Sequence, residues 1–570
     1  MAKADVHVHS KHSNEPSEWY LRKLGAPESF TEPKEIYRRC RERGMDFVTI
    51  SDHDSIAGAL EIAHLPGTFL SCEVTVEFPE DRCEIHVLTL GISEAQHREI
   101  QALRGNVYEL RDYLRANGIL CSVAHPLFRV NDRLTLDHVE KLLVLFDRFE
   151  ALNGMHDRRA NGLVRRIFGS LTPDRIETLA ERHGLAPWGP TPWIKTFTGG
   201  SDDHGGLYLG ATWTETPPAM TVEDYLVHLR NGRHEAGGDT GSSARLVQSL
   251  YAIAYEFYRR QFPLGIGRPR DPFSELLRSL ALGAPARPSR WVFWRRPAAS
   301  QPELMERSTF GSASRASQKY LGSLLRGLVR HARRGRLMEG LASISHLAPL
   351  ALSVAPYLVA AHSLHKDADL LDEASLRFLG ERPEEGSNGR RDRRAWLTDS
   401  LADAEGVAQA LRTLPGPDRE LVALTCAAEE APAGLEVRSF RPLMCIRLPG
   451  WERRKLAVPP LLEVLDHCER ERYAEIVISS PGPFGLLGVA AGRLLGIPVT
   501  GLYCTELPSQ VRQLAGSEAL EALSWSYLRW LFGHAERLWV PSTREWELLA
   551  GHGFSPARLA LLTGGRRMAA

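Results

Sequence analysis

Asp5-Val6-His7-Val8-His9-Ser10, close to the N-terminus, alternates apolar residues with histidines. Successive side chains of a β-strand point to opposite faces, so we predict a strand over residues 5–9 with both imidazoles on one face. Buried imidazole nitrogens need partners, which makes this pair poor at packing but well suited to binding a metal ion. A single His-x-His also arises by coincidence in a long chain, so other residues must decide between the two interpretations.

Length and composition indicate a multidomain globular protein. The chain has 570 residues, of which 43% are hydrophobic and 25% charged, and we expect about three domains. The 70 basic residues balance the 70 acidic ones, so charge gives no indication of a nucleic-acid partner. The eight cysteines form no Cys-x-x-Cys pair, and the N-terminus has no apolar signal-peptide core. Both observations favour a cytoplasmic protein.

Residues 1–215 alternate between predicted strands and predicted helices. Strands are predicted at residues 5–9, 47–51, 69–78, 84–91, 119–124, 148–152 and 196–201, and helices at residues 33–43 and 93–117. This alternation predicts an α/β domain built on a parallel sheet or barrel, whose site lies at the C-terminal ends of the strands.

Six of these predicted strands carry side chains of the types that bind metal ions. The eight candidate ligands are His7, His9, His53, Glu73, His86, His125, Asp202 and His204. A single histidine at a strand end is more often structural. Ligand-type side chains at six strand ends are hard to explain by packing. Imidazoles and carboxylates together suit Zn, Mn or Fe. Eight ligands exceed the needs of one ion, so we predict two or three divalent ions that clamp phosphate oxygens and generate hydroxide at neutral pH.

The motifs of this region resemble a known family as a set. They are His7-Val8-His9, Ser51-Asp52-His53, Glu73, His86, His125-Pro126 and Gly200-Ser201-Asp202-Asp203-His204. Over about residues 1–210 they resemble the polymerase and histidinol phosphatase (PHP) domain of metal-dependent phosphoesterases. The resemblance implies a distorted (β/α)7 barrel. It also implies one ion held by His7, His9, Glu73 and Asp202, a second held by Glu73, His86 and His125, and a third bound by His53 and His204.

One position departs from the pattern of the resembled family. Its members often carry an Asp soon after the first motif that helps to hold the third ion, whereas this chain has Asn14 there. A neutral amide is a weaker ligand than a carboxylate. His12 is the alternative ligand, and a two-ion enzyme stays open.

Substrate binding has one candidate segment, residues 153–159. It follows the sixth predicted strand and therefore lies at the mouth of a barrel site. Arg158 or Arg159 could bind a substrate phosphate bidentately. A solvated surface turn is an equally good interpretation.

Residues 216–390 form a predicted helical middle region. Helices are predicted at residues 225–230, 244–260, 318–336 and 337–365, with a Pro- and Arg-rich stretch at residues 267–297 and a charged linker at residues 381–394. The apolar run at residues 347–361 is shorter than the roughly 20 residues of a membrane span. A buried helical hairpin is the favoured interpretation. The alternative is a peripheral contact of residues 318–365 with the inner membrane.

Residues 391–570 return to strand–helix alternation and predict one Rossmann-like domain. The motifs Leu397-Thr398-Asp399-Ser400, Ser480-Pro481-Gly482-Pro483-Phe484-Gly485 and Trp539-Val540-Pro541-Ser542 resemble the N-terminal half of family-4-type glycosyltransferases. Cys504 and Glu506 stand where that pattern tends to have His and Asp. The sequence printed ends at residue 570 without room for a donor domain, so we do not expect independent glycosyl transfer.

Together these patterns predict a cytoplasmic phosphoesterase. A metal-bound hydroxide would attack phosphorus in a phosphomonoester or nucleotide-like phosphate, and His53 or His204 would assist proton transfer where not ligating. The glycosyltransferase-like region suggests a sugar phosphate as the substrate. The alternative is a carbohydrate-binding or assembly protein whose PHP scaffold is catalytically idle. An active barrel that hydrolyses another bond, such as an amide, also stays open.

Overall fold

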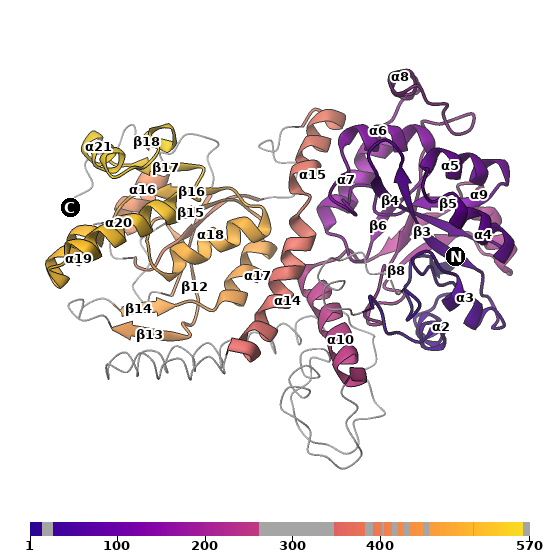
Figure 1. The fold of residues 1–570 in the computed structure, drawn as a ribbon, viewed down its shortest axis with the longest axis horizontal. Helices are drawn as coiled ribbons and strands as arrows, with labels where there is room; N and C mark the ends of the chain where they lie inside the picture. Colours follow the sequence, from indigo (N-terminus) through magenta and orange to yellow (C-terminus); the bar gives the residue numbers. More distant parts are fainter. Residues whose placement is uncertain are drawn as a thin grey trace, which may run out of the picture. The chain divides into compact units, whose positions relative to one another are not determined.

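The chain consists of two compact units. Unit 1 comprises residues 1–313 and 366–383, and unit 2 comprises residues 314–365 and 384–570. The computed structural model describes residues 1–13, 27–261, 347–381, 391–401, 404–412, 420–426, 434–447, 455–505 and 507–562 (Figure 1). These limits do not coincide with the ranges 1–215, 216–390 and 391–570 predicted from the sequence.

Unit 1 is built on two sheets. The first has the strand order β2 (Phe47–Val48), β1 (Ala2–Asp5), β8 (Thr212–Thr216) and β9 (Glu235–Gly238). The second has the order β3 (Ser71–Phe78), β4 (Cys83–Leu90), β5 (Leu120–Val123), β6 (Arg148–Asn153) and β7 (Thr196–Gly200). Isolated bridges join the sheets on both sides, His53 to Glu73 and Val8 to Asp203. The two sheets therefore continue into one another around a common interior.

The second sheet is not uniformly parallel, as plain strand–helix alternation would predict. β3, β4 and β5 pair antiparallel, and β5, β6 and β7 pair parallel. Only residues 79–82 connect β3 to β4, and so short a connection cannot make the crossover that parallel strands require.

The first strand is also shorter than predicted, because β1 ends at Asp5 and the two histidines follow it. The buried Asp5 carboxylate accepts hydrogen bonds from the backbone N–H of Ser201 (2.9 Å) and of Gly210 (2.7 Å). Beyond Asp5 the chain pairs with residues 202 and 203 instead of β8, since Asp202 N donates to His7 O at 2.8 Å. The motif therefore lies in a loop fixed at both edges.

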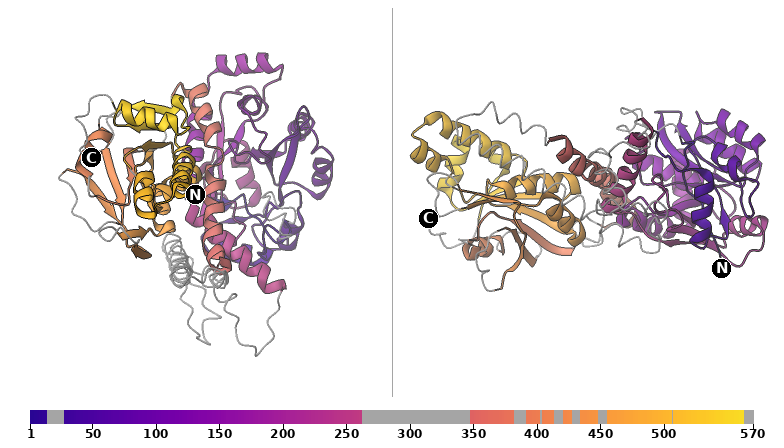
Figure 2. Two further views of the ribbon diagram at one scale, coloured as in Figure 1. Left: turned by 60° about the vertical axis from the view of Figure 1, so that its left-hand side comes forward. Right: turned by 90° about the horizontal axis from the view of Figure 1, so that it is seen from below.

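Helices cover the outside of these strands (Figures 1 and 2). They are α2 (Pro33–Glu42), α3 (Ala57–Ile62), α4 (Glu94–Ala102), α5 (Val107–Ala116), α6 (Leu136–Leu145), α7 (Arg158–Gly169), α8 (Pro173–His183), α9 (Val222–Arg230) and α10 (Ser243–Gln261). The one long helix predicted at residues 93–117 is two helices. The Asn106 side chain accepts hydrogen bonds from the N–H groups of Tyr108 and Glu109, which starts a new helix at that point.

Residues 366–381 return to unit 1 as helix α15 (Ala368–Ala374) and the π-helical turn η3 (Ser375–Leu379). Leu370, Leu371 and Phe378 join the hydrophobic core beneath α6 and α7. Around this core, Arg129 Nη1 lies 2.7 Å from Asp369 Oδ1, and Arg159 pairs with Asp372. This segment is therefore an integral part of unit 1 rather than a linker.

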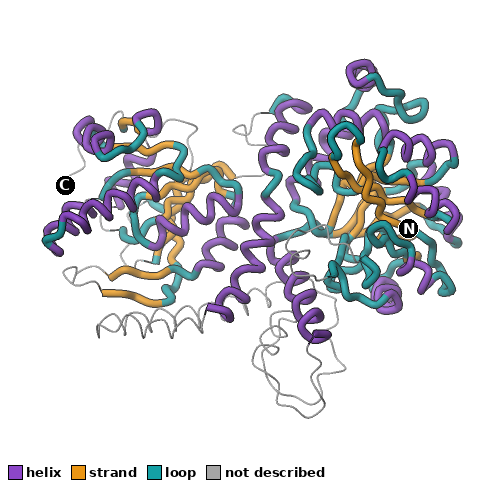
Figure 3. Tube along the Cα trace, in the orientation of Figure 1, coloured by secondary structure: helices purple, strands orange, loops and turns teal. Residues whose placement is uncertain are grey.

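Unit 2 contains a seven-stranded sheet in which every pairing is parallel. Its order is β12 (Glu436–Ser439), β11 (Glu420–Thr425), β10 (Arg391–Leu397), β15 (Tyr473–Ile478), β16 (Val499–Leu502), β17 (Arg537–Val540) and β18 (Leu559–Leu561). A separate antiparallel pair comprises β13 (Met444–Arg447) and β14 (Lys455–Val458). The predicted Rossmann-like domain is confirmed (Figure 3).

Both faces of this sheet are covered by helices. The described helices of unit 2 are α14 (Leu347–His365), α16 (Ala404–Arg412), α17 (Leu461–Glu471), α18 (Pro483–Leu495), α19 (Leu507–Ala515), α20 (Glu518–Phe532) and α21 (Thr543–Gly551). Trp396 packs in one core with α16, whereas Ile478 lies against Gly488 of α18. A Cβ at Gly488 would lie 2.4 Å from Ile478 Cγ2, so this glycine permits the close approach of α18.

The membrane alternative stays a prediction. Residues 318–346 and 382–390 lie outside the described residues, as do residues 267–297. Within the described part of the chain, no helix is long and apolar enough to cross a membrane.

Gly200 of β7 gives a test of the seam between the two sheets. A Cβ there would lie 2.3 Å from His7 Cβ and 2.9 Å from His7 N, whereas a Cβ on Gly162 of α7 would meet no atom within 4 Å. We expect Gly200→Ala to lower the free energy of unfolding by about 1–3 kcal/mol. The control Gly162→Ala should leave it unchanged or raise it by roughly 0.5–1 kcal/mol. Urea unfolding followed by circular dichroism measures both, and equal stability of the two variants would contradict the packing described.

Candidate metal centre

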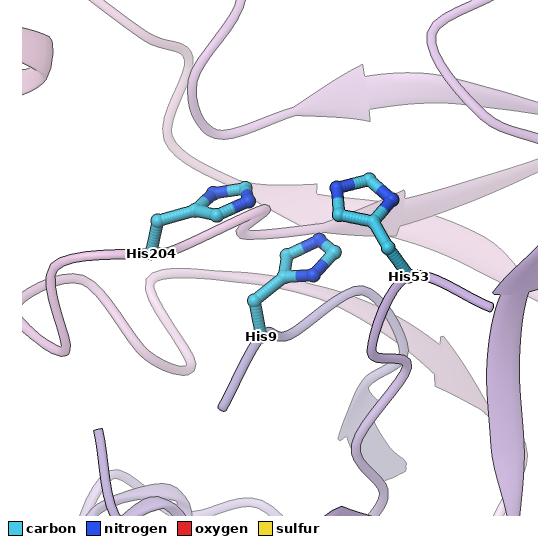
Figure 4. A group of neighbouring side chains, drawn as sticks. All are labelled: His9, His53 and His204. Atoms are coloured by element: carbon cyan, nitrogen blue, oxygen red, sulfur yellow. The ribbon is translucent and has the colours of Figure 1, made fainter. Parts of the chain in front are cut away.

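The candidate ligands converge on one buried site in unit 1. Four overlapping groups each place three ligand atoms within 4.8 Å of one another: His9, His53 and His204; His7, His125 and Asp202; His7, His9 and Glu73; and His53, Glu73 and His86. All eight residues predicted from the sequence belong to these groups. Figure 4 shows the first group, in which the three rings come from three separate loops.

Glu73, near the start of β3, lies at the centre of the cluster. Its Oε2 lies 3.1 Å from His7 Nε2, 3.2 Å from His9 Nε2 and 3.2 Å from His53 Nδ1. Its Oε1 lies 2.9 Å from His86 Nδ1 and 3.3 Å from His125 Nε2. Each oxygen of this single carboxylate thus faces different imidazoles, which is the arrangement of a carboxylate that bridges two ions.

Asp202 supplies the second carboxylate of the cluster. Its Oδ1 lies 3.1 Å from His9 Nε2, 3.4 Å from His7 Nε2 and 3.7 Å from His204 Nδ1. Its Oδ2 accepts a hydrogen bond from Asn153 Nδ2 at 3.0 Å. One oxygen is therefore directed at the imidazoles while the other is held by the protein.

The ligand atoms fit a metal ion better than they fit one another. In the described part of the chain, His7 Nε2, His9 Nε2, His86 Nδ1 and Glu73 Oε2 are buried and make no hydrogen bond. Buried polar atoms are almost always hydrogen-bonded, so atoms that converge without hydrogen-bond geometry indicate a common partner. With imidazole and carboxylate donors around it, this interior is suited to hold more than one metal ion.

The electrostatics favour the ligating forms of Glu73, His86 and His204. At His7, His9 and His53 the neighbouring carboxylates outweigh the effect of burial and raise the pKa of each imidazole. Burial alone would raise the pKa of Glu73, but the neighbouring imidazoles, chiefly that of His7, hold it well below its usual range. Burial lowers the pKa of His86 to about 4 and the pKa of His204 to about 4. A carboxylate and neutral imidazoles are the protonation states that bind metal ions.

Two of the cluster residues have left-handed backbone conformations, with φ of 27° at His125 and 51° at Asp202. Such conformations cost about 1–3 kcal/mol each and persist where the surroundings impose them. Here Glu150 Oε2 accepts a hydrogen bond from His125 N at 3.1 Å, and His7 O accepts one from Asp202 N. The backbone strain is thus located at residues that aim side chains into the site.

Glu150 of β6 was missed by the sequence reasoning, although it supports the cluster. Its Oε1 lies 2.9 Å from His7 Nδ1, and its Oε2 accepts a hydrogen bond from Asn153 Nδ2 at 2.9 Å. A carboxylate behind a ligating imidazole fixes the tautomer and the ring orientation. The sequence signal that could have revealed Glu150 is its charge, because its neighbours in the predicted strand, Phe149 and Ala151, are apolar.

Asp52, in the motif Ser51-Asp52-His53, holds the segment that follows the motif His7-Val8-His9. Its Oδ1 accepts hydrogen bonds from Ser10 N (2.6 Å) and Ser13 Oγ (3.0 Å), and its Oδ2 accepts one from Ser10 Oγ (2.7 Å). Ser13 Oγ in turn lies 3.0 Å from His9 Nδ1. The Ser-Asp-His motif therefore contributes one ligand candidate, His53, and one anchor.

Asn14 and His12 are the two uncertain ligands predicted for a third ion. Asn14 lies outside the described residues. His12 Nε2 lies 2.7 Å from Glu61 Oε1, and His12 belongs to none of the four groups. Glu28, which the sequence did not indicate, lies beside His53 and His204 instead.

The proposed phosphate-binding arginines lie on the first turn of α7. Arg158 is exposed, and Arg159 pairs with Asp372 of α15. The residue of this segment beside the cluster is His156, whose ring centre lies 5.1 Å from that of His125. Burial lowers the pKa of His156 to about 3.

In unit 2, the order of the strands reverses between β10 and β15, where open α/β sheets bind ligands. Asp399 follows β10 and accepts a hydrogen bond from Phe484 N (3.1 Å) at the start of α18. Cys504 follows β16, and its Sγ lies 3.2 Å from Ser479 O. Glu506 is not among the described residues.

Comparison with known proteins gives a family match within unit 2 and a short match to one relative. The sequence model of the glycosyl transferase 4-like domain matches residues 395–565. An uncharacterized protein of Methanocaldococcus jannaschii is 37% identical over 67 residues, which are 12% of this chain and 37% of that protein. The chain therefore spans about a third of the length of this relative.

A solved structure from Bifidobacterium adolescentis, described as a "putative metal-dependent phosphoesterase", is 16% identical to this chain. The match covers 40% of this chain and 96% of that one, with a TM-score of 0.22. The resemblance found in the C-terminal part of the sequence agrees with the match of the glycosyl transferase 4-like domain model.

Replacing Glu150 should weaken metal binding without removing a ligand. We expect Glu150→Gln to lower the affinity for Mn²⁺ or Zn²⁺ by about 10–100-fold, because the amide no longer fixes the His7 ring as the carboxylate does. Isothermal titration measures the affinity. The control is Glu77→Gln on β3, whose carboxylate pairs with Arg82 at 3.1 Å. Equal affinities of the two variants would contradict the supporting role of Glu150.

Proposed function

We propose that unit 1 is a metal-dependent phosphoesterase. The observation that carries the proposal is Glu73, a buried carboxylate with imidazole nitrogens at 2.9–3.3 Å from both of its oxygens. Such a side chain would help to hold two divalent ions. Paired ions are the usual means of stabilising both the attacking and the leaving oxygen of a displacement at phosphorus.

Each ligand has a role in this proposal. His7, His9, Glu73 and Asp202 would hold one ion, and Glu73, His86 and His125 a second. Divalent ions in these positions polarise phosphate oxygens and lower the pKa of water. His204 or His53, where not ligating, would pass a proton to the leaving oxygen.

The substrate that we propose is a phosphomonoester or a nucleotide-like phosphate. A sugar phosphate is the preferred class, because the same chain carries a region that matches glycosyl transferase 4-like domains. Arg158 remains the candidate for the substrate phosphate, since Arg159 is paired with Asp372. The metal is proposed to be Zn, Mn or Fe.

A second candidate function belongs to unit 2. The match over residues 395–565 favours a carbohydrate-binding or assembly protein related to glycosyltransferases, with unit 1 as an idle scaffold. The two candidates differ in metal content. Elemental analysis of the purified full chain that finds two or three ions favours the enzyme, and a metal-free chain favours the scaffold.

Phosphatase activity should depend on the cluster. We expect Glu73→Ala and His9→Ala each to reduce the rate of hydrolysis by more than about 100-fold. This loss exceeds the one expected for residues such as Glu150, which only support a ligand. The assay is a panel of phosphate esters, including sugar phosphates, with each of Zn²⁺, Mn²⁺ and Fe²⁺.

The matched controls are His64→Ala and Glu77→Ala, since neither residue belongs to the four ligand groups. Both should retain wild-type activity. Circular dichroism establishes that the inactive variants are folded. Undiminished hydrolysis by folded Glu73→Ala and His9→Ala chains would rule the assignment out.

A further inference from the structure

We propose that Glu28 supplies the carboxylate ligand of a third metal position, together with the imidazoles of His53 and His204. The inference rests on the proposed metal-dependent function of unit 1 and extends it, with His53 and His204 as metal ligands instead of groups that pass a proton. It assigns to this chain's own Glu28 the place that Asn14 and His12 were predicted to fill.

The carboxylate of Glu28 lies between the two imidazoles. Its Oε2 lies 3.2 Å from His53 Nε2, and its Oε1 lies 3.6 Å from His204 Nε2. His53 and His204 also form a group with His9, and Figure 4 shows these three rings close together. Glu28 therefore adds the carboxylate that an all-imidazole group lacks.

The surroundings of Glu28 indicate a ligand rather than a surface residue. Glu28 is 5% exposed. Among the described residues, its Oε2 makes no hydrogen bond, and neither does His204 Nε2. A buried carboxylate is normally stabilised by hydrogen bonds or by coordination of a metal ion. The ion pairs recorded for Glu28 are both with imidazoles that belong to the cluster.

Glu28 is held in place by its own short segment. Ser29 Oγ donates to His9 O at 3.3 Å, and Lys11 N donates to Thr31 O at 2.9 Å, so the segment is fixed to the first motif. On the other side, a Cβ at Gly206 would lie 2.6 Å from Thr31 Oγ1, so this segment also packs closely on the loop that follows His204. The two loops that carry His9 and His204 thus position Glu28 from both sides.

His12 does not compete for this position. It pairs with Glu61, and Lys11 Nζ also lies 3.2 Å from the same Glu61 oxygen. Glu28 is then the carboxylate that faces the Nε2 atoms of both His53 and His204, whereas Glu73 and Asp202 lie nearest to their Nδ1 atoms. Two imidazoles and one carboxylate make a three-ligand set of the kind found in open Zn²⁺ sites, and Mn²⁺ and Fe²⁺ also accept such ligands.

The test counts ions and does not measure activity. Full-length wild type, Glu28→Gln and Glu32→Gln are saturated with Mn²⁺ and dialysed, and the ions retained per chain are counted by mass spectrometry. Glu32 is the matched control, because its carboxylate pairs with Lys11 at 2.7 Å and its side chain is 56% exposed. The affinity of each site follows from titration with Mn²⁺, and circular dichroism checks the fold of each variant.

We expect three ions in wild type and in Glu32→Gln, and two in Glu28→Gln, with the third dissociation constant raised at least about tenfold. Glu28→Asp keeps the charge and should bind the third ion more tightly than Glu28→Gln. The Asp variant also keeps the test valid if Glu28→Gln does not fold.

Three ions in Glu28→Gln at wild-type affinity would overturn the inference and leave the proposed function intact. Two ions in both wild type and Glu28→Gln would also overturn it. A wild-type chain that binds no ion would overturn the inference and the proposed function together. The failure of the third position and the failure of the whole site are therefore distinguishable.

Discussion

The architecture of unit 1 depends on one buried carboxylate in the midst of imidazoles. Glu73 lies where an isolated bridge to His53 joins the first sheet to the second, and the residues around it come from loops and strands far apart in sequence. Placing so many titratable groups together without water is unfavourable unless a counter-charge is shared among them. The strained backbone at His125 and Asp202 and the carboxylate of Glu150 behind His7 are best understood as the means by which the fold maintains this arrangement.

Unit 2 is organised by a different constraint, the parallel pairing of its strands. The order of the strands reverses at β10 and β15, and Asp399 at that point contacts the first turn of α18. Gly488 allows the same helix to approach Ile478. The conformation of this unit thus follows from the pairing of strands along one sheet and from the helices that pack on it.

The sequence singled out the residues that the structure brings together, because imidazoles and carboxylates at strand ends have no good packing explanation. Other features depended on partners that no local pattern reveals. Glu28 reaches the cluster only because Ser29 and Thr31 attach its segment to loops that precede and follow it in the chain. His86 lies within β4, since the short connection to β3 imposes an antiparallel hairpin. Strand β8 was overlooked although its alternating threonines were a visible signal, and the capping side chain of Asn106 divided a predicted long helix.

The path of the chain between the two units has a consequence for folding during synthesis. The chain leaves unit 1 after residue 313 and returns to it at residue 366, so a segment of unit 2 is made before unit 1 is complete. Until Leu370, Leu371 and Phe378 have left the ribosome, part of the unit 1 core lacks its final layer. Domains usually fold in the order in which they emerge. During synthesis the core of unit 1 therefore keeps an apolar surface exposed until its last helix has emerged.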